Sequence, residues 1–333
     1  MKGRAVVATA PGRVAFQEVT VPEPTDEDVV VRVRHSWISN GTEGSFVRGE
    51  RIAGDTPRGP SDPLPFPHVP GYQKVGVVER VGAAVQNVAV GQTVFATVSK
   101  VEGQFYPFGG HLSPAVTHRG QVWPLPEHVR PVAASGLVLT QVGYNVGMRP
   151  HLEPGDAVVV LGDGLVGHWA AQTLQQRGAR VLLAGRHDER LARFMAGPDD
   201  RIVNVTRDDL AGIIRAWASA GGVQAVADTV GSVSSLEALY PVLRRGGHLV
   251  SAGFHGPNGQ IDIQKMRDRE LTLHAPAGWT TERMDATLDL LARGVLQTEP
   301  LITHRYPVER AGDAFDLILS RREPFLGVVL DWE

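Results

Sequence analysis

The sequence predicts an α/β protein of two domains, one a doubly wound parallel sheet and the other rich in short strands. Its 333 residues suffice for two domains of ordinary size. The first third contains β-branched runs bounded by proline and glycine, whereas apolar strands and helical segments alternate from residue 154 onward. Such alternation is typical of parallel β-α-β units whose strands are buried on both faces.

The first domain is predicted from strands at 29–33, 75–81 and 93–98. Between the first two lies 54–71 (GDTPRGPSDPLPFPHVPG), whose prolines exclude a regular helix and predict an ordered loop or flap. Short strands separated by turns indicate a barrel-like domain.

The second domain begins near residue 131, and helical spacing follows in 133–147. Strands and helices are then predicted alternately at 157–161, 165–177, 180–184, 188–196, 201–205, 208–220, 224–229, 233–244 and 248–253, with the glycines of 244–248 (RRGGH) ending the last helix. A further helix at 309–321 and a strand at 326–331 return to the first domain. We therefore predict one domain of residues 1–132 with 300–333 and another of residues 133–299.

Charge and composition exclude several classes of function. The chain has 33 Lys and Arg and 36 Asp and Glu, a formal charge of −3, which does not suit a nucleic-acid or anionic-membrane partner. It has no cysteine, so disulfides, thiolate zinc sites and cysteine nucleophiles are excluded. No signal peptide and no apolar run of membrane-spanning length is visible, and we expect a cytoplasmic protein.

The best chemical signal is the strand 157–161 followed by 162–167 (GDGLVG) and a helix. Gly162 allows the tight turn, Gly164 lets the backbone approach a pyrophosphate, and Gly167 lets the helix pack close to the strand. A phosphate then meets the backbone N–H groups of the helix N-terminus, where Leu165 and Val166 lie. A G-x-G-x-x-G motif in this context predicts the dinucleotide site of a Rossmann sheet.

The end of the next strand indicates which dinucleotide binds. An NAD site has an Asp or Glu there for the ribose 2′-hydroxyl, but the sequence has Gly185 and Arg186. Arg186 is suited to a 2′-phosphate, and Asp188 comes too late to replace the missing carboxylate. We therefore expect NADP(H) rather than NAD(H). The alternative is that Arg186 is only a solvated residue at a strand end.

Taken together, these features resemble the medium-chain dehydrogenase/reductase superfamily over nearly the whole chain. The resemblance rests on four segments. These are 70–82 (PGYQKVGVVERVG), 90–94 (VGQTV), 153–156 (EPGD) and the G-x-G-x-x-G motif at 162–167. The segments 38–43 (ISNGTE) and 300–305 (PLITHR) are similar to the branch that contains the bacteriochlorophyllide a dehydrogenases. The resemblance implies a GroES-like β-barrel catalytic domain, a Rossmann domain, and a homodimer, commonly formed through an edge strand. The segment 270–276 is a candidate for that strand, and the alternative is an ordinary terminal strand.

The sequence departs from the zinc-binding members of that family. Their early cysteine ligand corresponds to Ser39 or Asn40, their G-H-E turn to 71–73 (GYQ), and their later ligand to Val138. A hydroxyl, a phenol and an alkyl group do not make a zinc site. Histidines remain, but their spacing matches no metal motif: His35, His68, His111 and His118. We predict no metal.

Without zinc, a side chain must polarise or protonate the substrate oxygen. Tyr72 occupies the family's metal-ligand turn and is the first candidate for this proton donor. Thr42 resembles the hydroxyl that relays protons in zinc relatives, and Ser39 is placed to bond substrate or ribose. Glu43 and His68 are further candidates as acids. The alternatives are that Tyr72 only fills the space of the metal, that Ser39 and Thr42 only cap a turn, and that Glu43 is structural.

The resemblance also implies contacts to the cofactor. Thr140 matches the helix that faces the nicotinamide, and the other positions follow the fourth and fifth strands, at the edge where ligands bind open α/β sheets. These other positions are Asp228, Val230, Ala252 and Gly253.

The sequence leaves three functions open. The first is an NADP(H)-dependent, zinc-independent oxidoreductase that interconverts a secondary alcohol and a ketone. The second is an NADPH-dependent reductase of the C=C bond of enones or quinones, and the third is a catalytically silent NADPH-binding protein. The loops 46–66 and 101–111 carry aromatic residues that favour an aromatic or apolar small-molecule substrate, although packing between the loops explains them equally well: Phe46, Phe66, Phe105, Tyr106 and Phe108.

Overall fold

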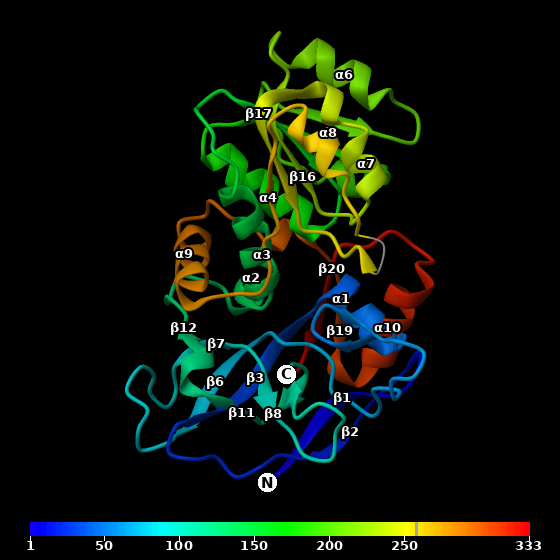
Figure 1. Ribbon diagram of the computed structural model, residues 1–333. Coiled ribbons are helices and arrows are strands. Elements are labelled where there is room, and N and C mark those ends of the chain that lie inside the picture. The colour runs from blue at the N-terminus through cyan, green and yellow to red at the C-terminus, as the bar shows by residue number, and fades with distance from the viewer. Residues whose placement is uncertain (257–258) are drawn as a thin grey trace. The chain divides into compact units, whose positions relative to one another are not determined.

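The computed structural model describes residues 1–256 and 259–333, and these divide into two compact units. Unit 1 consists of Met1–Val138 with Thr298–Glu333, and unit 2 of Leu139–Gln297. Figure 1 shows the strands and helices of each unit.

Unit 1 is built mainly of antiparallel strands. A seven-stranded sheet has the order β12-β7-β6-β3-β20-β19 with β11 also paired to β3, a three-stranded sheet has the order β10-β1-β2, and two short hairpins join β4 to β5 and β8 to β9. The strands are β1 (Lys2–Ala10), β2 (Arg13–Thr20), β3 (Asp28–Ile38), β4 (Arg51–Ala53), β5 (Thr56–Pro57), β6 (Lys74–Val81), β7 (Thr93–Ala96), β8 (Ser99–Lys100), β9 (Phe108–Gly109), β10 (Leu112–Ser113), β11 (Ala115–His118), β12 (Val122–Pro124), β19 (Ile302–Pro307) and β20 (Gly327–Asp331).

The C-terminal segment completes unit 1. β20 pairs antiparallel with β3, with Val329 opposite Trp37, and parallel with β19. Helix α10 packs its buried Phe315 and Ile318 into the same apolar cluster as Ile38. The helices of this unit are α1 (Asn40–Val47), α2 (Pro131–Ala134) and α10 (Ala311–Ser320). The pairing of β20 with β3 brings the C-terminal segment back to the first domain, as the sequence predicts.

Unit 2 is a six-stranded parallel sheet of order β15-β14-β13-β16-β17-β18, which confirms the predicted doubly wound fold. Its strands are β13 (Ala157–Leu161), β14 (Arg180–Gly185), β15 (Arg201–Asn204), β16 (Val223–Asp228), β17 (Leu243–Ser251) and β18 (Thr272–His274). Its helices are α3 (Leu137–Met148), α4 (Leu165–Gln176), α5 (Asp188–Leu191), α6 (Leu210–Trp217), α7 (Val233–Glu237), α8 (Ile263–Arg267) and α9 (Thr281–Ala292).

Both faces of this sheet are covered, as the continuous apolar strands require. Val159 packs in one cluster with Ile214 of α6, and Val158 packs in a second cluster with Leu174 of α4. All of these side chains are fully buried, and each contributes about 1.5–3 kcal/mol of stability through burial. Successive residues of β13 therefore face opposite cores, and its carboxyl end is held rigidly.

Two predicted helices are wrong in extent. The predicted helix at 233–244 is only α7, followed by a 3-10 turn at Tyr240–Val242, and Leu243 already begins β17. Pro241 lacks the N–H that a longer helix would need. The glycines of 244–248 therefore lie within β17 rather than ending a helix. The predicted helix at 188–196 ends at Leu191, because Phe194 turns into the core and is 6% exposed.

Candidate active site

The predicted dinucleotide loop lies between β13 and α4 of unit 2. Gly162 has φ +118, which favours glycine, and a Cβ on Gly167 would clash with the carbonyl oxygen of Gly162. Gly164 is the N-cap of α4 without a side-chain hydrogen bond, and a Cβ there would meet only open space. The first-turn N–H groups at Leu165 and Val166 therefore have no side-chain cap, and the loop fits a dinucleotide pyrophosphate.

The aspartate inside this motif, Asp163, anchors the end of β14. Its Oδ2 accepts hydrogen bonds from the backbone N–H groups of Arg186 at 2.7 Å and His187 at 2.8 Å. Burial opposes its ionisation, but the bonds from His187 and Arg186 hold the pKa of Asp163 below its usual value. Gly185 leaves the space that this carboxylate fills. This role is not among those predicted from the sequence, although Asp163 lies between two glycines of the motif.

The side chain of Arg186 is exposed, and within the described residues its guanidinium makes no hydrogen bond or ion pair. The nearby Asp188 is already paired, because Arg207 binds both of its oxygens at 2.7 and 2.9 Å and Asn204 donates to it at 2.8 Å. The Arg207 and Asn204 bonds lower the pKa of Asp188 to about 2. At the end of β14, the guanidinium of Arg186 is therefore available to a ligand, whereas the carboxylate of Asp188 is already hydrogen-bonded within the protein.

The other predicted cofactor positions lie on three elements of unit 2. Thr140 is fully buried in α3. The carboxylate of Asp228 accepts from the backbone N–H groups of Val230 at 2.8 Å and Gly231 at 3.2 Å, so it shapes the loop after β16. The side chain of Val230 is 56% exposed on that loop. Ala252 and Gly253 follow β17, and both of their N–H groups donate to the carbonyl oxygen of Asp228.

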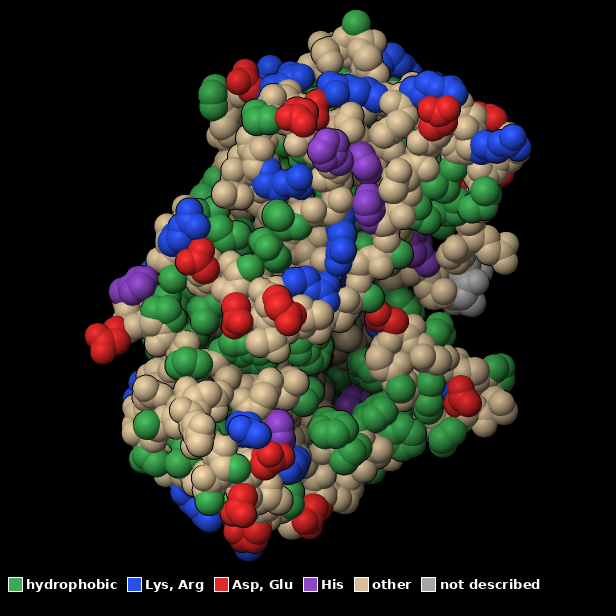
Figure 2. Space-filling model, turned by 60° about the vertical axis from the view of Figure 1, so that its left-hand side comes forward, with side chains coloured by type: hydrophobic (Ala, Val, Ile, Leu, Met, Phe, Trp, Pro, Cys, Tyr) green, Lys and Arg blue, Asp and Glu red, His purple; other side chains and the backbone are tan. Residues whose placement is uncertain are grey.

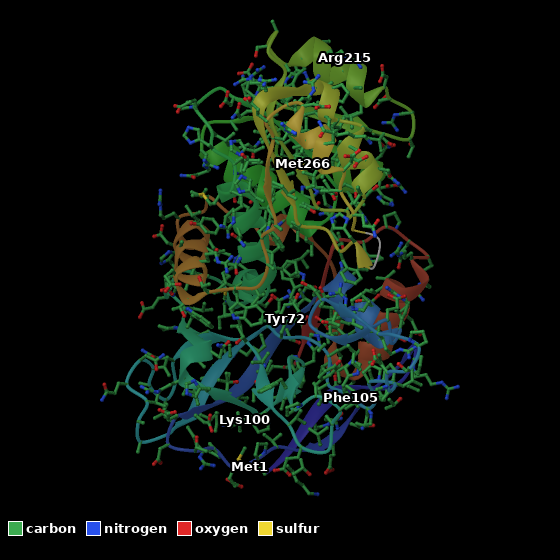
Figure 3. The ribbon with its side chains drawn as sticks, viewed as in Figure 1. Met1, Tyr72, Lys100, Phe105, Arg215 and Met266 are labelled. Carbon is green, nitrogen blue, oxygen red and sulfur yellow. The ribbon has the colours of Figure 1, made fainter. Side chains whose placement is uncertain are left out.

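In unit 1, the structure brings together three hydroxyl groups predicted from the sequence. Ser39 is the N-cap of α1 but makes no side-chain cap bond. The side chains of Ser39 and Thr42 instead hydrogen-bond the hydroxyl of Tyr72, which lies two residues before β6 and is labelled in Figure 3. Burial, with a smaller contribution from Glu43, raises the pKa of Tyr72 to about 12. The phenol is therefore protonated throughout the neutral range.

Glu43 lies beneath these hydroxyls and is 1% exposed. One of its oxygens accepts from the backbone N–H of Ser39 at 2.7 Å, and the other lies 2.8 Å from Nε2 of His111. His111 has no role predicted from the sequence beyond being one of four available histidines. The two glycines that precede it, Gly109 and Gly110, are the one local signal of its tightly packed position.

The predicted acid His68 has a different environment. Its Nδ1 donates to the carbonyl oxygen of Pro65 at 2.6 Å, and its buried Nε2 has no hydrogen-bond partner among the described residues. Burial lowers the pKa of His68. The imidazole is therefore neutral and its one proton is engaged, so we do not retain His68 as a proton donor.

His68 lies at the centre of an aromatic cluster that we call the His68 cluster. The predicted loops do meet here, since the N–H of Phe105 donates to the carbonyl oxygen of Pro67 at 2.6 Å. Ring centroids around His68 are 5.3 to 6.1 Å away, and they belong to Phe46, Phe66 and Tyr106. Phe105 joins Tyr106 at 4.9 Å, whereas Phe108 is 54% exposed.

The positions that correspond to zinc ligands in relatives do not suit zinc. They hold Ser39, Tyr72 and Val138, and Val138 is 2% exposed with no donor atom in its side chain. In the part of the chain that the structure describes, no three His, Cys, Asp or Glu side chains are arranged to hold a metal ion. The donor set therefore does not fit the catalytic zinc of zinc-type relatives.

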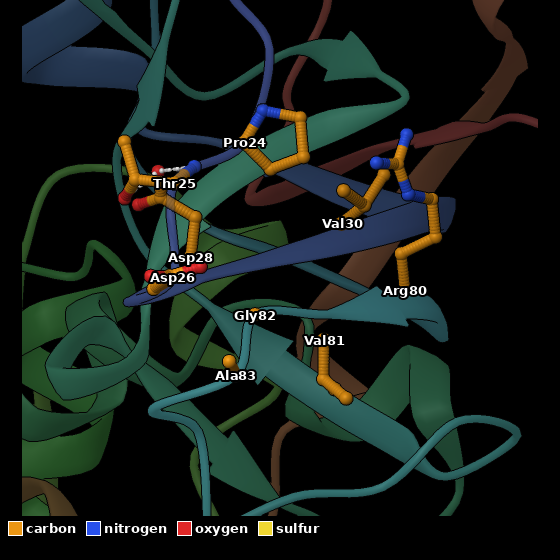
Figure 4. A pocket seen from close by; sticks show the side chains of 9 residues that line it. All are labelled: Pro24, Thr25, Asp26, Asp28, Val30, Arg80, Val81, Gly82 and Ala83. Atoms are coloured by element: carbon orange, nitrogen blue, oxygen red, sulfur yellow. Dashed lines mark hydrogen bonds between the residues drawn. The ribbon is translucent and has the colours of Figure 1, made fainter.

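Other surface features do not compete with this site. Figure 4 shows a pocket near β3 and β6 that is lined in part by Asp28. The carboxylate of Asp28 accepts hydrogen bonds from Lys100 at 2.7 and 2.8 Å and from the backbone N–H of Thr25 at 2.8 Å. Both oxygens of this carboxylate are therefore already hydrogen-bonded within the protein. Figure 2 shows acidic and basic side chains interspersed on the visible face.

Among the described residues, no helix is both long and apolar enough to cross a membrane.

Two family models match the chain. The model of the alcohol dehydrogenase GroES-like domain matches residues 25–127, and the model of the zinc-binding dehydrogenase matches residues 166–293.

Curated relatives match over almost the whole chain. D-arabitol-phosphate dehydrogenase of Enterococcus avium is 26% identical, with 97% of this chain and 96% of the relative covered. The 2-desacetyl-2-hydroxyethyl bacteriochlorophyllide A dehydrogenase of Cereibacter sphaeroides is 27% identical, with 100% of this chain and 99% of the relative covered.

Solved structures share the fold. One from Escherichia coli CFT073, described as a short chain alcohol dehydrogenase complexed with NADH, has a TM-score of 0.84 at 22% identity, with 99% of each chain covered. A zinc-binding dehydrogenase from Sinorhizobium meliloti 1021 bound to NADP has a TM-score of 0.80 at 19% identity, with 99% of each chain covered. With a GroES-like domain, a doubly wound dinucleotide sheet and full-length dehydrogenase relatives, the chain belongs to the medium-chain dehydrogenase/reductase superfamily of oxidoreductases.

Proposed function

We propose that the protein is an NADP(H)-dependent, zinc-independent oxidoreductase that interconverts a secondary alcohol and a ketone. The observation that carries the proposal is the phenol of Tyr72, held by Ser39 and Thr42 at the turn where zinc relatives have a metal ligand. The relatives from Enterococcus and Cereibacter are both named as dehydrogenases, which supports the reaction class.

Tyr72 is suited to give a proton to a carbonyl oxygen rather than to take one from an alcohol. A reduced dinucleotide would, when bound, supply the hydride for the carbonyl carbon. The carbonyl oxygen must gain a proton as its negative charge develops, and the phenol of Tyr72 can give it. The pKa of about 12 keeps the phenol protonated at neutral pH. Once the proton has left, the hydroxyls of Ser39 and Thr42 can both donate to the phenolate. These properties favour the direction from ketone to alcohol.

The end of β14 supports NADP(H). The exposed guanidinium of Arg186 can form charge-assisted bonds to a 2′-phosphate. Asp188, the carboxylate that could favour a free 2′-hydroxyl, is engaged by Arg207 and Asn204. One solved structure contains NADH and the other NADP, so the two do not distinguish between the cofactors. The proposal of NADP(H) rests on Arg186 and Asp188 of this chain.

Unit 1 supports a substrate with an apolar or ring-shaped part. In the His68 cluster, the rings of Phe46, Phe66 and Tyr106 gather around one buried imidazole. The hydroxyl of Tyr106 is buried without a hydrogen-bond partner among the described residues. An aromatic wall with an unsatisfied polar atom suits a largely apolar small molecule that carries a polar group.

The test is a fluorescence titration of the purified protein with NADPH and NADH, followed by assays of NADPH oxidation with ketones, quinones and enones. We expect NADPH to bind more tightly than NADH, and Arg186→Ala to weaken NADPH binding by about tenfold or more through loss of a charge-assisted bond. Arg215→Ala, which removes an exposed arginine on α6, is the matched control and should bind as the parent does.

Each outcome separates the candidate functions. Oxidation of NADPH by ketones that persists after treatment with a strong chelator supports the proposal. Turnover only with quinones or enones would replace it with a C=C reductase, and binding without any turnover would replace it with a silent binding protein. Tighter binding of NADH than of NADPH would overturn the assignment of Arg186.

A further inference from the structure

A second polar chain is buried directly beneath the hydroxyls of Ser39, Thr42 and Tyr72. Its members are 0–1% exposed: Ser36, Glu43 and His111. Nε2 of His111 lies 2.8 Å from Oε2 of Glu43, and Nδ1 of His111 lies 2.8 Å from Oγ of Ser36. The indole N–H of Trp332, near the C-terminus, donates to the same Oγ at 2.9 Å.

The two ends of this chain fix the direction of the hydrogen bonds that they make. An indole N–H only donates, so Oγ of Ser36 accepts from Trp332. A carboxylate only accepts, so Nε2 of His111 donates to Oε2 of Glu43, while Nδ1 of His111 lies 2.8 Å from Oγ of Ser36. The backbone N–H of Ser39 donates to the other carboxylate oxygen. Both oxygens of the Glu43 carboxylate therefore accept a hydrogen bond, one from the start of α1 and one from His111.

Close packing joins the chain to the turn that carries Tyr72. Gly71 has φ +84, and a Cβ on it would lie 2.7 Å from Nε2 of His111. A Cβ on Gly110 would clash with the backbone N of Tyr72. His111 thus packs against the backbone that precedes Tyr72, while Glu43 holds the start of α1, from which Ser39 and Thr42 extend.

We propose that His111 and Glu43 are positioning residues, which lock the start of α1 to the 71–72 turn so that the hydroxyls of Ser39 and Thr42 stay on the phenol of Tyr72. This inference rests on the proposed role of Tyr72 as proton donor. The chain does not supply the proton, because it ends at an indole N–H that does not ionise. Tyr72 must regain its proton on the side of Thr42, which is half-buried whereas Glu43 and His111 are fully buried.

The first test needs neither substrate nor cofactor. With ¹⁵N-labelled histidine, NMR of the wild-type protein should show a proton on Nε2 of His111, hydrogen-bonded to Glu43. A matched comparison is His35, which lies on β3, is partly exposed, and has its Nδ1 2.8 Å from Asp331. An Nε2 of His111 that carries no proton would contradict the inferred direction even if no variant folds.

The second test follows the effect on Tyr72. With ¹³Cζ-labelled tyrosine, and the Tyr72 signal assigned from Tyr72→Phe, we expect Glu43→Gln and His111→Phe to shift that signal, and His35→Gln to leave it unchanged. The charged groups that act on Tyr72 are Glu43 and Arg51, which raise and lower its pKa respectively. Glu43→Gln should therefore lower the pKa of Tyr72. An unshifted Tyr72 signal in both variants would overturn the proposal.

The kinetic readout uses whichever ketone the NADPH assay identifies. Glu43→Gln should lower kcat by about tenfold with KM for NADPH unchanged, which is the effect of misplacing a group that acts in the transition state. Glu43→Asp, which keeps the charge, should recover part of the loss. If no ketone is reduced while both NMR results hold, the proposed function fails and the positioning role of the pair survives. If turnover is unaffected in Glu43→Gln, the positioning role fails and the function survives.

Discussion

At the scale of single residues, the site of unit 1 shows how hydroxyls can stand where a related enzyme holds a metal. Zinc stabilises a developing alkoxide by its charge, whereas a phenol does so by giving up a proton. The phenol of Tyr72 needs donors that stabilise its conjugate base, and Ser39 and Thr42 supply them. Ser39 can do this because its hydroxyl is not used to cap α1, while its backbone N–H is held by the carboxylate of Glu43.

The most direct prediction at this scale concerns the phenol itself. Tyr72→Phe should lower kcat for ketone reduction by about 10²- to 10⁴-fold, the usual contribution of a positioned acid. The affinity for NADPH should be unchanged, since the dinucleotide loop lies in unit 2. Stopped-flow kinetics and fluorescence titration measure the two quantities separately. Tyr306→Phe, the same change on β19 of the same unit, is the control, and equal losses in both variants would show that Tyr72 has no special role.

At the scale of elements, β6 carries a buried lysine beside the site. Lys74 is 0% exposed, and its Nζ donates to Thr97 O and Ser99 Oγ at 2.6 Å each and to Gly109 O at 3.2 Å. These bonds connect β6 to β8, β9 and the segment after β7. Burial lowers the pKa of Lys74 from 10.5 to about 7.

The lowered pKa predicts how stability depends on pH. Between pH 7 and 10.5 the unfolded chain binds the lysine proton and the folded chain has released it, so the free energy of unfolding from this group rises with pH. Below about pH 7 both states are protonated and the contribution is constant. Urea unfolding across this window should give a steeper positive slope for wild type than for Lys74→Met. Lys2→Met, which changes an exposed lysine, should match wild type, and a Lys74→Met slope equal to that of wild type would show that Lys74 keeps its proton.

The strands and helices also show which parts of the fold can be predicted from the sequence and which cannot. The strand predicted at 157–161 has the bounds of β13, because a run of apolar residues between a Gly-Asp turn and a glycine motif has few alternatives. The helix predicted at 233–244 is wrong because its apolar spacing continues past Pro241 into β17, where the side chains pack at the spacing of a strand. Spacing alone does not distinguish the two over so short an apolar run.

For the candidate site, local motifs suffice for residues near one another in sequence. Ser39, Thr42 and Glu43 lie within one turn of α1, and the family's ligand turn points to Tyr72. The partnership of Glu43 with His111 spans 68 positions of the chain, so no local pattern contains it. The anchoring of β14 by Asp163 is similarly a product of the tertiary fold, because Asp163 and Arg186 are 23 positions apart.

At the scale of the whole molecule, unit 2 ends in an open sheet edge. β18 is the last strand in the order of the sheet, and its Leu273 is 38% exposed. One side of the strand pairs with β17, so the N–H and C=O groups of the other side are available for another strand. A short edge strand with an exposed apolar side chain is a natural point for a second copy to extend the sheet, which is how we expect the homodimer to form.

This expectation can be tested by measuring molar mass in solution. We expect the wild-type protein to elute as a dimer in size-exclusion chromatography with light scattering. Leu273→Lys should shift it to monomer, because a charge on an edge strand opposes pairing with another edge. Leu64→Lys, at a leucine of unit 1 that is 54% exposed, controls for the added charge and should remain dimeric. A wild-type monomer, or a dimer that survives Leu273→Lys, would place any contact between copies elsewhere than β18. NADPH binding by a monomeric Leu273→Lys variant would further show that one copy of unit 2 contains the complete dinucleotide site, as the loop at 162–167 and Arg186 predict.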